Sequence, residues 1–131
     1  MITLEHANLN VTDLARSLEF YRSLLPGWGI RWEGRTSEGE RWIHFGPAGD
    51  GQPGYLSLYQ DPHAASGTGA HALAVQHLGF AHPDVDALVG ALATAGIRAT
   101  DRVDDGHYRR AYFQDPDGHE LEMVQKLVQR L

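Results

Sequence analysis

The feature that most constrains this chain is an order of segments that occurs twice. His6 is followed seven residues later by Asp13, and His77 is followed seven residues later by Asp84. Each histidine lies in a segment of alternating apolar and polar residues, which is typical of a strand, and each aspartate precedes apolar residues at helical spacing. The chain is therefore predicted to contain the same strand–helix unit twice.

The first copy is predicted to be a βαβββ module over residues 1–60. A strand over residues 2–11 precedes a helix that Asp13 caps, and Pro26-Gly27 ends the helical spacing. Three further strands follow, each bounded by turn-rich segments, and they are predicted over residues 29–35, 41–46 and 55–60.

The second copy is predicted over residues 75–131, after a linker over residues 61–74 that is rich in small residues. A strand over residues 75–81 precedes a helix that Asp84 caps and Gly96 ends. Three strands are again predicted, over residues 97–102, 107–114 and 119–125, the last two joined by the turn sequence Asp-Pro-Asp-Gly at 115–118.

Strand alternation predicts that each module has an apolar face under its helix and a polar, aromatic face opposite. The predicted polar face holds His6, Asn8, Trp42, His44, Ser57, Tyr59, His77, Tyr108, Arg110, Tyr112 and Glu122. When the two copies are overlaid, Ser57 stands where Glu122 stands. A sheet of this kind either faces water or curls into a cup around a ligand, and the cup explains more of these residues. Trp28 and Trp32, at a helix-to-strand junction, are expected in the core.

Composition excludes several classes of protein. The net charge is −6, and the chain has no stripe of basic residues that could neutralise phosphates, so a nucleic-acid-binding protein is not expected. No apolar run approaches the length of a membrane span, and the chain does not start with a signal-like segment, so we expect a cytoplasmic protein without membrane contact. Because the chain has no cysteine, a bound metal could rest only on imidazole, carboxylate, carbonyl or water ligands.

Two histidines and one carboxylate occupy matched places in the doubled pattern: His6, His77 and Glu122. These are ligand types that divalent metals accept from proteins. A single strand histidine is more often structural, but the matched pair favours a metal site. His44 could be a substitute ligand, a nearby base or an exposed strand residue. Four histidines in predicted loops or turns are expected to be exposed: His63, His71, His107 and His119.

Six segments carry a resemblance to a known family: His6–Asp13, Ser17–Tyr21, Leu25–Gly27, His77–Phe80, Asp84–Asp86 and Phe113–Gly118, the last of which leads to Glu122. Together they resemble the vicinal oxygen chelate superfamily, which includes glyoxalase I, bleomycin-resistance proteins, fosfomycin-resistance thiol transferases and extradiol dioxygenases. The resemblance implies an α+β fold in which two tandem βαβββ modules form a cupped mixed sheet, an open barrel with the helices on its outer face. It also implies a divalent metal held by His6, His77 and Glu122.

What the resemblance implies about activity is a metal-dependent enzyme that binds a small substrate through vicinal oxygens. The reaction could be an isomerisation, a ring cleavage with dioxygen or a thiol addition. The metal could be Fe, Mn, Ni or Zn. The glyoxalase I pattern has a carboxylate where Ser57 stands, so a four-ligand glyoxalase I site is not expected. Tyr112 and Arg110 are the expected catalytic residues. Tyr112 would donate a hydrogen bond to a metal-bound oxygen, and Arg110 would pair with a carboxylate or phosphonate. Residues expected to contact substrate are Trp42, Ser57, Tyr59 and Tyr108.

The alternative is a metal-free protein of the bleomycin-resistance type, in which the same cup sequesters a ligand and no bond is broken. The presence of all three candidate ligands counts against it. Members of this superfamily commonly pair, so a homodimer is expected.

Overall fold

A computed structural model of the chain describes residues 1–49, 53–64 and 75–127. The chain divides into two compact units, Met1–Ala65 and Ser66–Leu131. The first module comprises β1 (His6–Val11), α1 (Leu14–Leu24), β2 (Trp28–Arg35), β3 (Arg41–Pro47) and β4 (Tyr55–Gln60). The second comprises β5 (Leu78–Ala81), α2 (Val85–Thr94), β6 (Asp101–Asp104), β7 (Tyr108–Gln114) and β8 (Glu120–Lys126).

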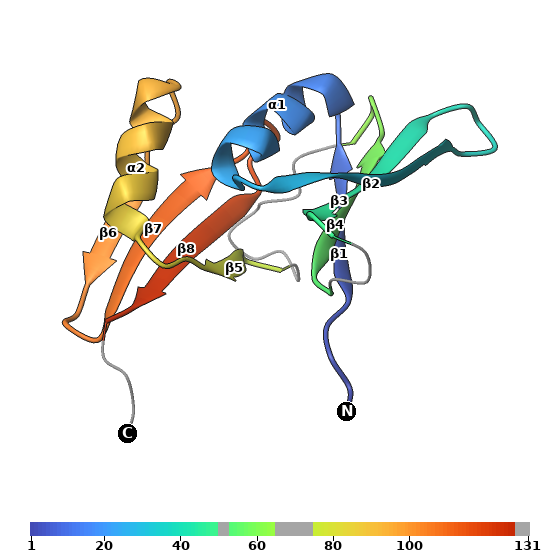
Figure 1. Cartoon of the computed structure of the whole chain (residues 1–131). Coiled ribbons are helices and arrows are strands. Elements are labelled where there is room, and N and C mark those ends of the chain that lie inside the picture. Colours follow the sequence, from blue (N-terminus) through green and yellow to red (C-terminus); the bar gives the residue numbers. More distant parts are fainter. Residues whose placement is uncertain (50–52, 65–74, 128–131) are drawn as a thin grey trace. The chain divides into compact units, whose positions relative to one another are not determined.

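Each module has one open, four-stranded mixed sheet (Figure 1), ordered β1-β4-β3-β2 in the first and β5-β8-β7-β6 in the second. The first and last strands of a module pair in parallel, and the other pairs are antiparallel. The predicted α+β class and the two βαβββ modules are therefore confirmed.

Both helices begin with the same two contacts. Asp13 accepts a hydrogen bond from the Arg16 amide, and Asp84 accepts one from the Ala87 amide. In addition, a glutamine on the last strand of each module accepts a hydrogen bond from the first helical amide, Gln60 from Leu14 and Gln125 from Val85, both at 3.0 Å. These contacts satisfy amides that have no partner inside the helix.

Each module buries an apolar core between its helix and one face of its sheet. The first core is made by Val11, Leu14, Leu18, Tyr21, Leu24, Leu25, Ile43, Phe45, Leu56 and Leu58, and the second by Val85, Leu88, Leu92, Ala111, Phe113, Leu121 and Met123. Because these residues alternate along the strands, the intervening side chains lie on the opposite face.

Strand register makes the two modules correspond residue by residue. Ser57 pairs with Asn8, which is two residues after His6, and Glu122 pairs with Gly79, two residues after His77. On the neighbouring strand, Ser57 pairs with His44 and Glu122 with Tyr112. The predicted equivalence of Ser57 and Glu122 is confirmed by this pairing, and it also makes His44 the counterpart of Tyr112.

Three strands have bounds that differ clearly from the predicted ones. The first strand begins at His6 and not at residue 2, because its partner β4 begins opposite it at Tyr55. The strand predicted over residues 97–102 is β6, Asp101–Asp104, because the amides of Gly96 and Ile97 still donate to helix carbonyls at the end of α2. The fifth strand is shorter than predicted, and His77 directly precedes it.

Trp32 also departs from expectation. Ile30 pairs with Phe45 and Trp32 with His44, so Arg31 is an extra residue in β2. This β-bulge interrupts the alternation and leaves Trp32 66% exposed, not in the core. Trp28 packs on Phe45, with ring centroids 6.1 Å apart.

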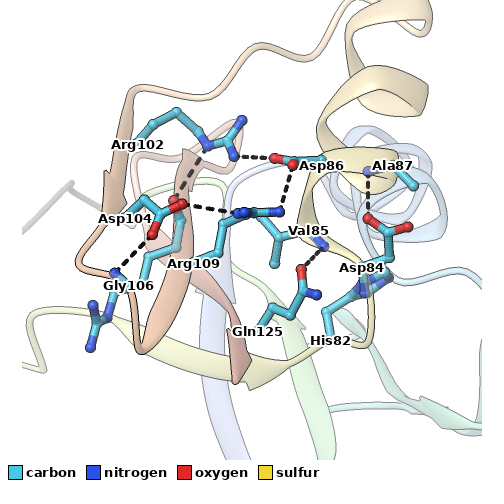
Figure 2. A network of polar contacts seen from close by, with 11 residues as sticks. His82, Asp84, Val85, Asp86, Ala87, Arg102, Asp104, Gly106, Arg109 and Gln125 are labelled. Carbon is cyan, nitrogen blue, oxygen red and sulfur yellow. Dashed lines mark hydrogen bonds and ion pairs between the residues drawn. The ribbon is translucent and has the colours of Figure 1, made fainter. Parts of the chain in front are cut away.

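A polar network joins α2 to β6 and β7 of the second module (Figure 2). Asp86, in the first turn of α2, accepts hydrogen bonds from Arg102 at 2.5 Å and Arg109 at 2.8 Å. Arg109 also contacts Asp104 at 3.1 Å. In the parts of the chain that the structure describes, no helix is both long and apolar enough to span a bilayer.

Candidate metal and substrate site

Two of the three predicted metal ligands meet in the second module. His77 Nε2 lies 2.9 Å from a carboxylate oxygen of Glu122, whose side chain is 13% exposed. The other ring nitrogen of His77 lies 3.8 Å from Glu120. His77 reaches Glu122 because β5 and β8 run in parallel, with Gly79 opposite Glu122 and no side chain between them. An imidazole nitrogen and a carboxylate oxygen thus lie close enough to bind one ion together.

Arg110 contacts the other oxygen of Glu122, with Nε at 3.2 Å. It also contacts Asp105 at 3.0 Å and stacks over the Tyr108 ring, 4.9 Å from its centroid. Backbone hydrogen bonds from Tyr108, and then the Arg110 side chain, lower the pKa of Asp105 to about 2. The Arg110 guanidinium is therefore shared between two carboxylates.

Tyr112 stands beside this cluster. It pairs with Glu122 across β7 and β8, and its ring meets that of His77 edge-on, with centroids 6.1 Å apart. Burial, and next the charge of Glu122, raise the pKa of the Tyr112 hydroxyl above its ordinary value. Tyr112 is consequently a protonated hydrogen-bond donor at neutral pH.

In the first module, His6 is held by two neighbours. Its Nδ1 lies 3.0 Å from Glu5 Oε1, and its ring stacks on Tyr55 with centroids 5.1 Å apart. The Tyr55 hydroxyl donates to the same Glu5 oxygen at 3.2 Å. Because a carboxylate can only accept, the Nδ1 atom carries a proton, and in the neutral ring the lone pair is therefore on Nε2.

A row of aromatic rings, called here the aromatic row, crosses the face of the first sheet that carries His6. It consists of Tyr55, His44, Trp42 and Tyr59. His44 lies 4.6 Å from Tyr55, Trp42 5.1 Å from His44, and Tyr59 6.0 Å from Trp42, measured between ring centroids. Burial is the main cause that lowers the pKa of His44. Trp42 lies flat across its strand partner Gly34, where a Cβ would come within 2.6 Å of the indole. Beneath this row Ser57 is 3% exposed.

The first module also contains a cavity of about 830 Å³. Arg31, Trp28, Trp32, His44 and Tyr55 line it, together with residues at the start of β2 and the end of β3, which pair with each other. The size suits a small organic molecule. The aromatic row and this cavity share His44 and Tyr55.

The structure brings His77, Glu122, Tyr112, Arg110 and Tyr108 together in the second module, and His6, His44, Trp42, Ser57 and Tyr59 on one face of the first. Within either module, the described residues bring no three side chains of histidine, aspartate or glutamate into an arrangement that could hold a metal. The convergence of His6 with His77 and Glu122 stays a prediction.

His119 is not the exposed loop residue that the sequence suggested. Its Nδ1 lies 2.6 Å from the buried carboxylate of Asp115, which also accepts hydrogen bonds from the amides of Asp117 and His119. The Asp115 hydrogen bond raises the pKa of His119. His71 lies outside the described residues.

Sequence reasoning missed Glu5, Tyr55 and Arg31. Alternation puts Glu5 on the face opposite His6, but Glu5 precedes the strand, so its side chain can bend back. Tyr55 could have been found, since it alternates with Ser57 and Tyr59. Arg31 could not, because a bulge has no reliable signature in one sequence.

Comparison with solved structures finds the same fold in proteins of several activities. Glyoxalase I of Leishmania major is 23% identical, with a TM-score of 0.77 and coverage of 95% of this chain and 87% of that one. Fosfomycin resistance protein FosX of Listeria monocytogenes, complexed with Mn(II) and a dihydroxypropylphosphonic acid, is 19% identical, with a TM-score of 0.71 and coverage of 94% and 92%.

The antibiotic-binding protein TnmS3 of Streptomyces sp. CB03234 is 23% identical, with a TM-score of 0.74 and coverage of 96% and 97%. At these identities the likeness shows the fold alone. No curated protein sequence gives a significant match. The family model for the Glyoxalase/Bleomycin resistance protein/Dioxygenase superfamily matches residues 3–123, and the chain therefore belongs to that superfamily.

Proposed function

We propose that this protein is a divalent-metal-dependent enzyme that binds a small substrate through two adjacent oxygens. His6, His77 and Glu122 would hold the metal, which could be Fe, Mn, Ni or Zn. Three protein ligands leave positions open for substrate. The observation that carries the proposal is the 2.9 Å approach of His77 Nε2 to Glu122, since these residues lie at the matched positions of the doubled fold.

The residues fit such an ion in two further respects. His6 presents Nε2, because Glu5 engages its Nδ1. Glu122 is mostly shielded from water, so its charge would be little screened. A bound divalent ion would act as a Lewis acid and stabilise negative charge that develops on the substrate.

The neighbouring residues have distinct proposed roles. Tyr112 donates a hydrogen bond to a substrate oxygen, since its raised pKa keeps it protonated. Arg110 orients Glu122 through the 3.2 Å contact and balances its charge. Trp42, Tyr59 and Tyr108 offer aromatic surfaces to the substrate, and the buried Ser57 supports the row above it. Because Ser57 carries no acid, proton transfer of the four-ligand glyoxalase I kind is not expected.

A second candidate is a metal-free binding protein. The continuous aromatic row of the first module favours it, because stacked rings can hold a planar ligand without chemistry. TnmS3, an antibiotic-binding protein, has a similar fold.

Metal content separates the two candidates. Purified protein is stripped with chelator, reconstituted anaerobically with each of the four ions and assayed for bound metal. The enzyme proposal predicts about one ion per chain for wild type and loss of that ion in His77→Ala. If every ion gives less than about a tenth of a metal equivalent per chain, and this content is the same in His77→Ala, the result would favour the binding protein.

A further inference from the structure

The side chain of Asp105 joins the turn between β6 and β7 to Arg110. Its Oδ1 accepts hydrogen bonds from the amides of His107 at 2.9 Å and Tyr108 at 2.8 Å. Its Oδ2 accepts a hydrogen bond from Arg110 Nη1 at 3.0 Å. Because two amides hold the carboxylate in one orientation, its second oxygen is a fixed partner for the guanidinium.

Arg110 reaches from this partner into the candidate metal site. Its guanidinium lies 4.9 Å from the centroid of the Tyr108 ring, and its Nε donates to Glu122 Oε1 at 3.2 Å. The other oxygen of that carboxylate, Oε2, lies 2.9 Å from His77 Nε2. The two oxygens of Glu122 therefore have different partners, and Oε2 is the one that lies beside the second candidate ligand.

The preceding residue, Asp104, makes the same kind of link on the other face of the sheet. Its Oδ1 accepts a hydrogen bond from the Gly106 amide at 3.0 Å, and its Oδ2 accepts one from Arg109 Nε at 3.1 Å. Strand alternation directs Arg109 to the face that α2 covers, where it contacts Asp86 at 2.8 Å (Figure 2). The two aspartate side chains are almost equally exposed, 49% for Asp104 and 46% for Asp105. One turn thus holds two arginines, one on each face.

The contact between Asp105 and Arg110 is expected to matter more for the site than for folding. A partly exposed ion pair contributes little to stability. In contrast, the hydrogen-bonded partner of a metal-binding carboxylate commonly changes metal affinity tenfold to hundredfold. An arginine side chain has many rotamers, and few of those open to Arg110 would direct its Nε at Glu122 if Asp105 did not hold the guanidinium.

We propose that Asp105 is a positioning residue of the candidate metal site. It acts through Arg110, which it orients so that Oε1 of Glu122 is engaged and Oε2 is left for an ion shared with His77. The inference rests on the proposed function, because it concerns the same ion, but the orientation of Arg110 can be measured in the metal-free protein.

Nuclear magnetic resonance of the metal-free protein tests the positioning. A hydrogen-bonded arginine Nε–H exchanges with water more slowly than a free one. Asp105→Asn keeps an oxygen for the turn amides and places a donor against Arg110, so we expect the exchange of Arg110 Nε–H to become about fivefold or more faster. Asp104→Asn is the matched control, and it should release Arg109 and leave Arg110 unchanged.

Metal affinity tests the consequence for the site. Competition with a chelator should show that Mn²⁺ binds about tenfold more weakly to Asp105→Asn and less than about twofold more weakly to Asp104→Asn. In an Arg110→Gln background, Asp105→Asn should change the affinity by less than about twofold, because the residue through which it acts is absent. A direct effect of the Asp105 charge would persist in that background.

Several results would overturn the inference. In folded wild type, which needs no variant to fold, Arg110 Nε–H could exchange as fast as in denaturant; in Asp105→Asn, it could keep the wild-type rate. Equal losses of Mn²⁺ affinity in the two asparagine variants, or an undiminished effect of Asp105→Asn in the Arg110→Gln background, would also contradict it. Failure of the proposed function looks different: wild type would bind no ion, whereas Asp105→Asn would still speed the exchange of Arg110 Nε–H.

Discussion

At the scale of single residues, Glu5 has a role that its place in the sequence conceals. Its carboxylate accepts from His6 Nδ1 and from the Tyr55 hydroxyl, so it fixes both the tautomer and the orientation of a candidate metal ligand. A partner on the second ring nitrogen commonly contributes tenfold to hundredfold to metal affinity.

Glu5→Ala is therefore expected to weaken metal binding about tenfold or more, measured by competition with a chelator. Tyr55→Phe, which keeps the stacked ring and removes only the hydroxyl, should have a smaller effect. Glu38→Ala removes an equal charge from the β2–β3 turn and controls for the effect of net charge on metal affinity. Equal affinities of the Glu5 and Glu38 variants would contradict the role assigned to Glu5.

His119 gives the stability of the second module a defined pH dependence. The hydrogen bond to Asp115 raises the pKa of His119 above 6.5, so the folded protein binds this proton more tightly than the unfolded chain does. The stabilisation is complete below pH 6.5 and is lost as pH rises through the folded-state pKa.

We expect the free energy of unfolding of wild type to exceed that of His119→Asn by about 1–3 kcal/mol at pH 6. This difference should shrink as the solution is made alkaline. Asparagine keeps a donor near Asp115 but does not titrate, so denaturant unfolding of the two proteins across pH isolates the imidazole. A difference that is constant with pH would show that protonation of His119 is not involved.

At the scale of elements, a glutamine near the end of β4 and one near the end of β8 cap the first amide of the helices. Gln125 Oε1 accepts from the Val85 amide, which no helical carbonyl can satisfy. Gln125→Met, similar in length but with no acceptor, should destabilise the protein by about 1–2 kcal/mol in chemical denaturation. Gln114→Met, at the exposed end of β7, is the control, and an equal loss in both variants would refute the capping role.

Most elements could be predicted from the sequence because their signals are local. Asp13 and Asp84 cap helices at the expected places, and the Asp-Pro-Asp-Gly turn closes on itself through a hydrogen bond from the Gly118 amide to the Asp115 carbonyl. Non-local contacts could not be predicted. The bulge at Arg31 depends on the pairing of β2 with β3. The late start of β6 depends on how far the last turn of α2 continues.

The same distinction applies to the candidate site. The pairing of His77 with Glu122 follows from two matched strands, and alternation placed both side chains on the polar face. The contacts of Glu5 and Arg31 depend on a strand end and a bulge, and the Asp115–His119 contact on a side chain folding back over a turn.

At the scale of the whole molecule, we predict a homodimer, because each module has only four strands and edge strands of small sheets are commonly covered by a partner. Light scattering should give about twice the 14.5 kDa mass of one chain. A single species at the mass of one chain, over a range of concentrations, would refute the dimer.

At the same scale, we propose that His6 of the first module and His77 of the second bind the same metal ion, together with Glu122. Pulsed electron paramagnetic resonance of the Mn²⁺-loaded protein measures this directly, because it detects the nitrogen of each coordinated imidazole. The account predicts two imidazole ligands in wild type, one in His6→Ala and one in His77→Ala, with His63→Ala unchanged. A single imidazole in wild type, or a signal that survives intact in His6→Ala, would contradict it.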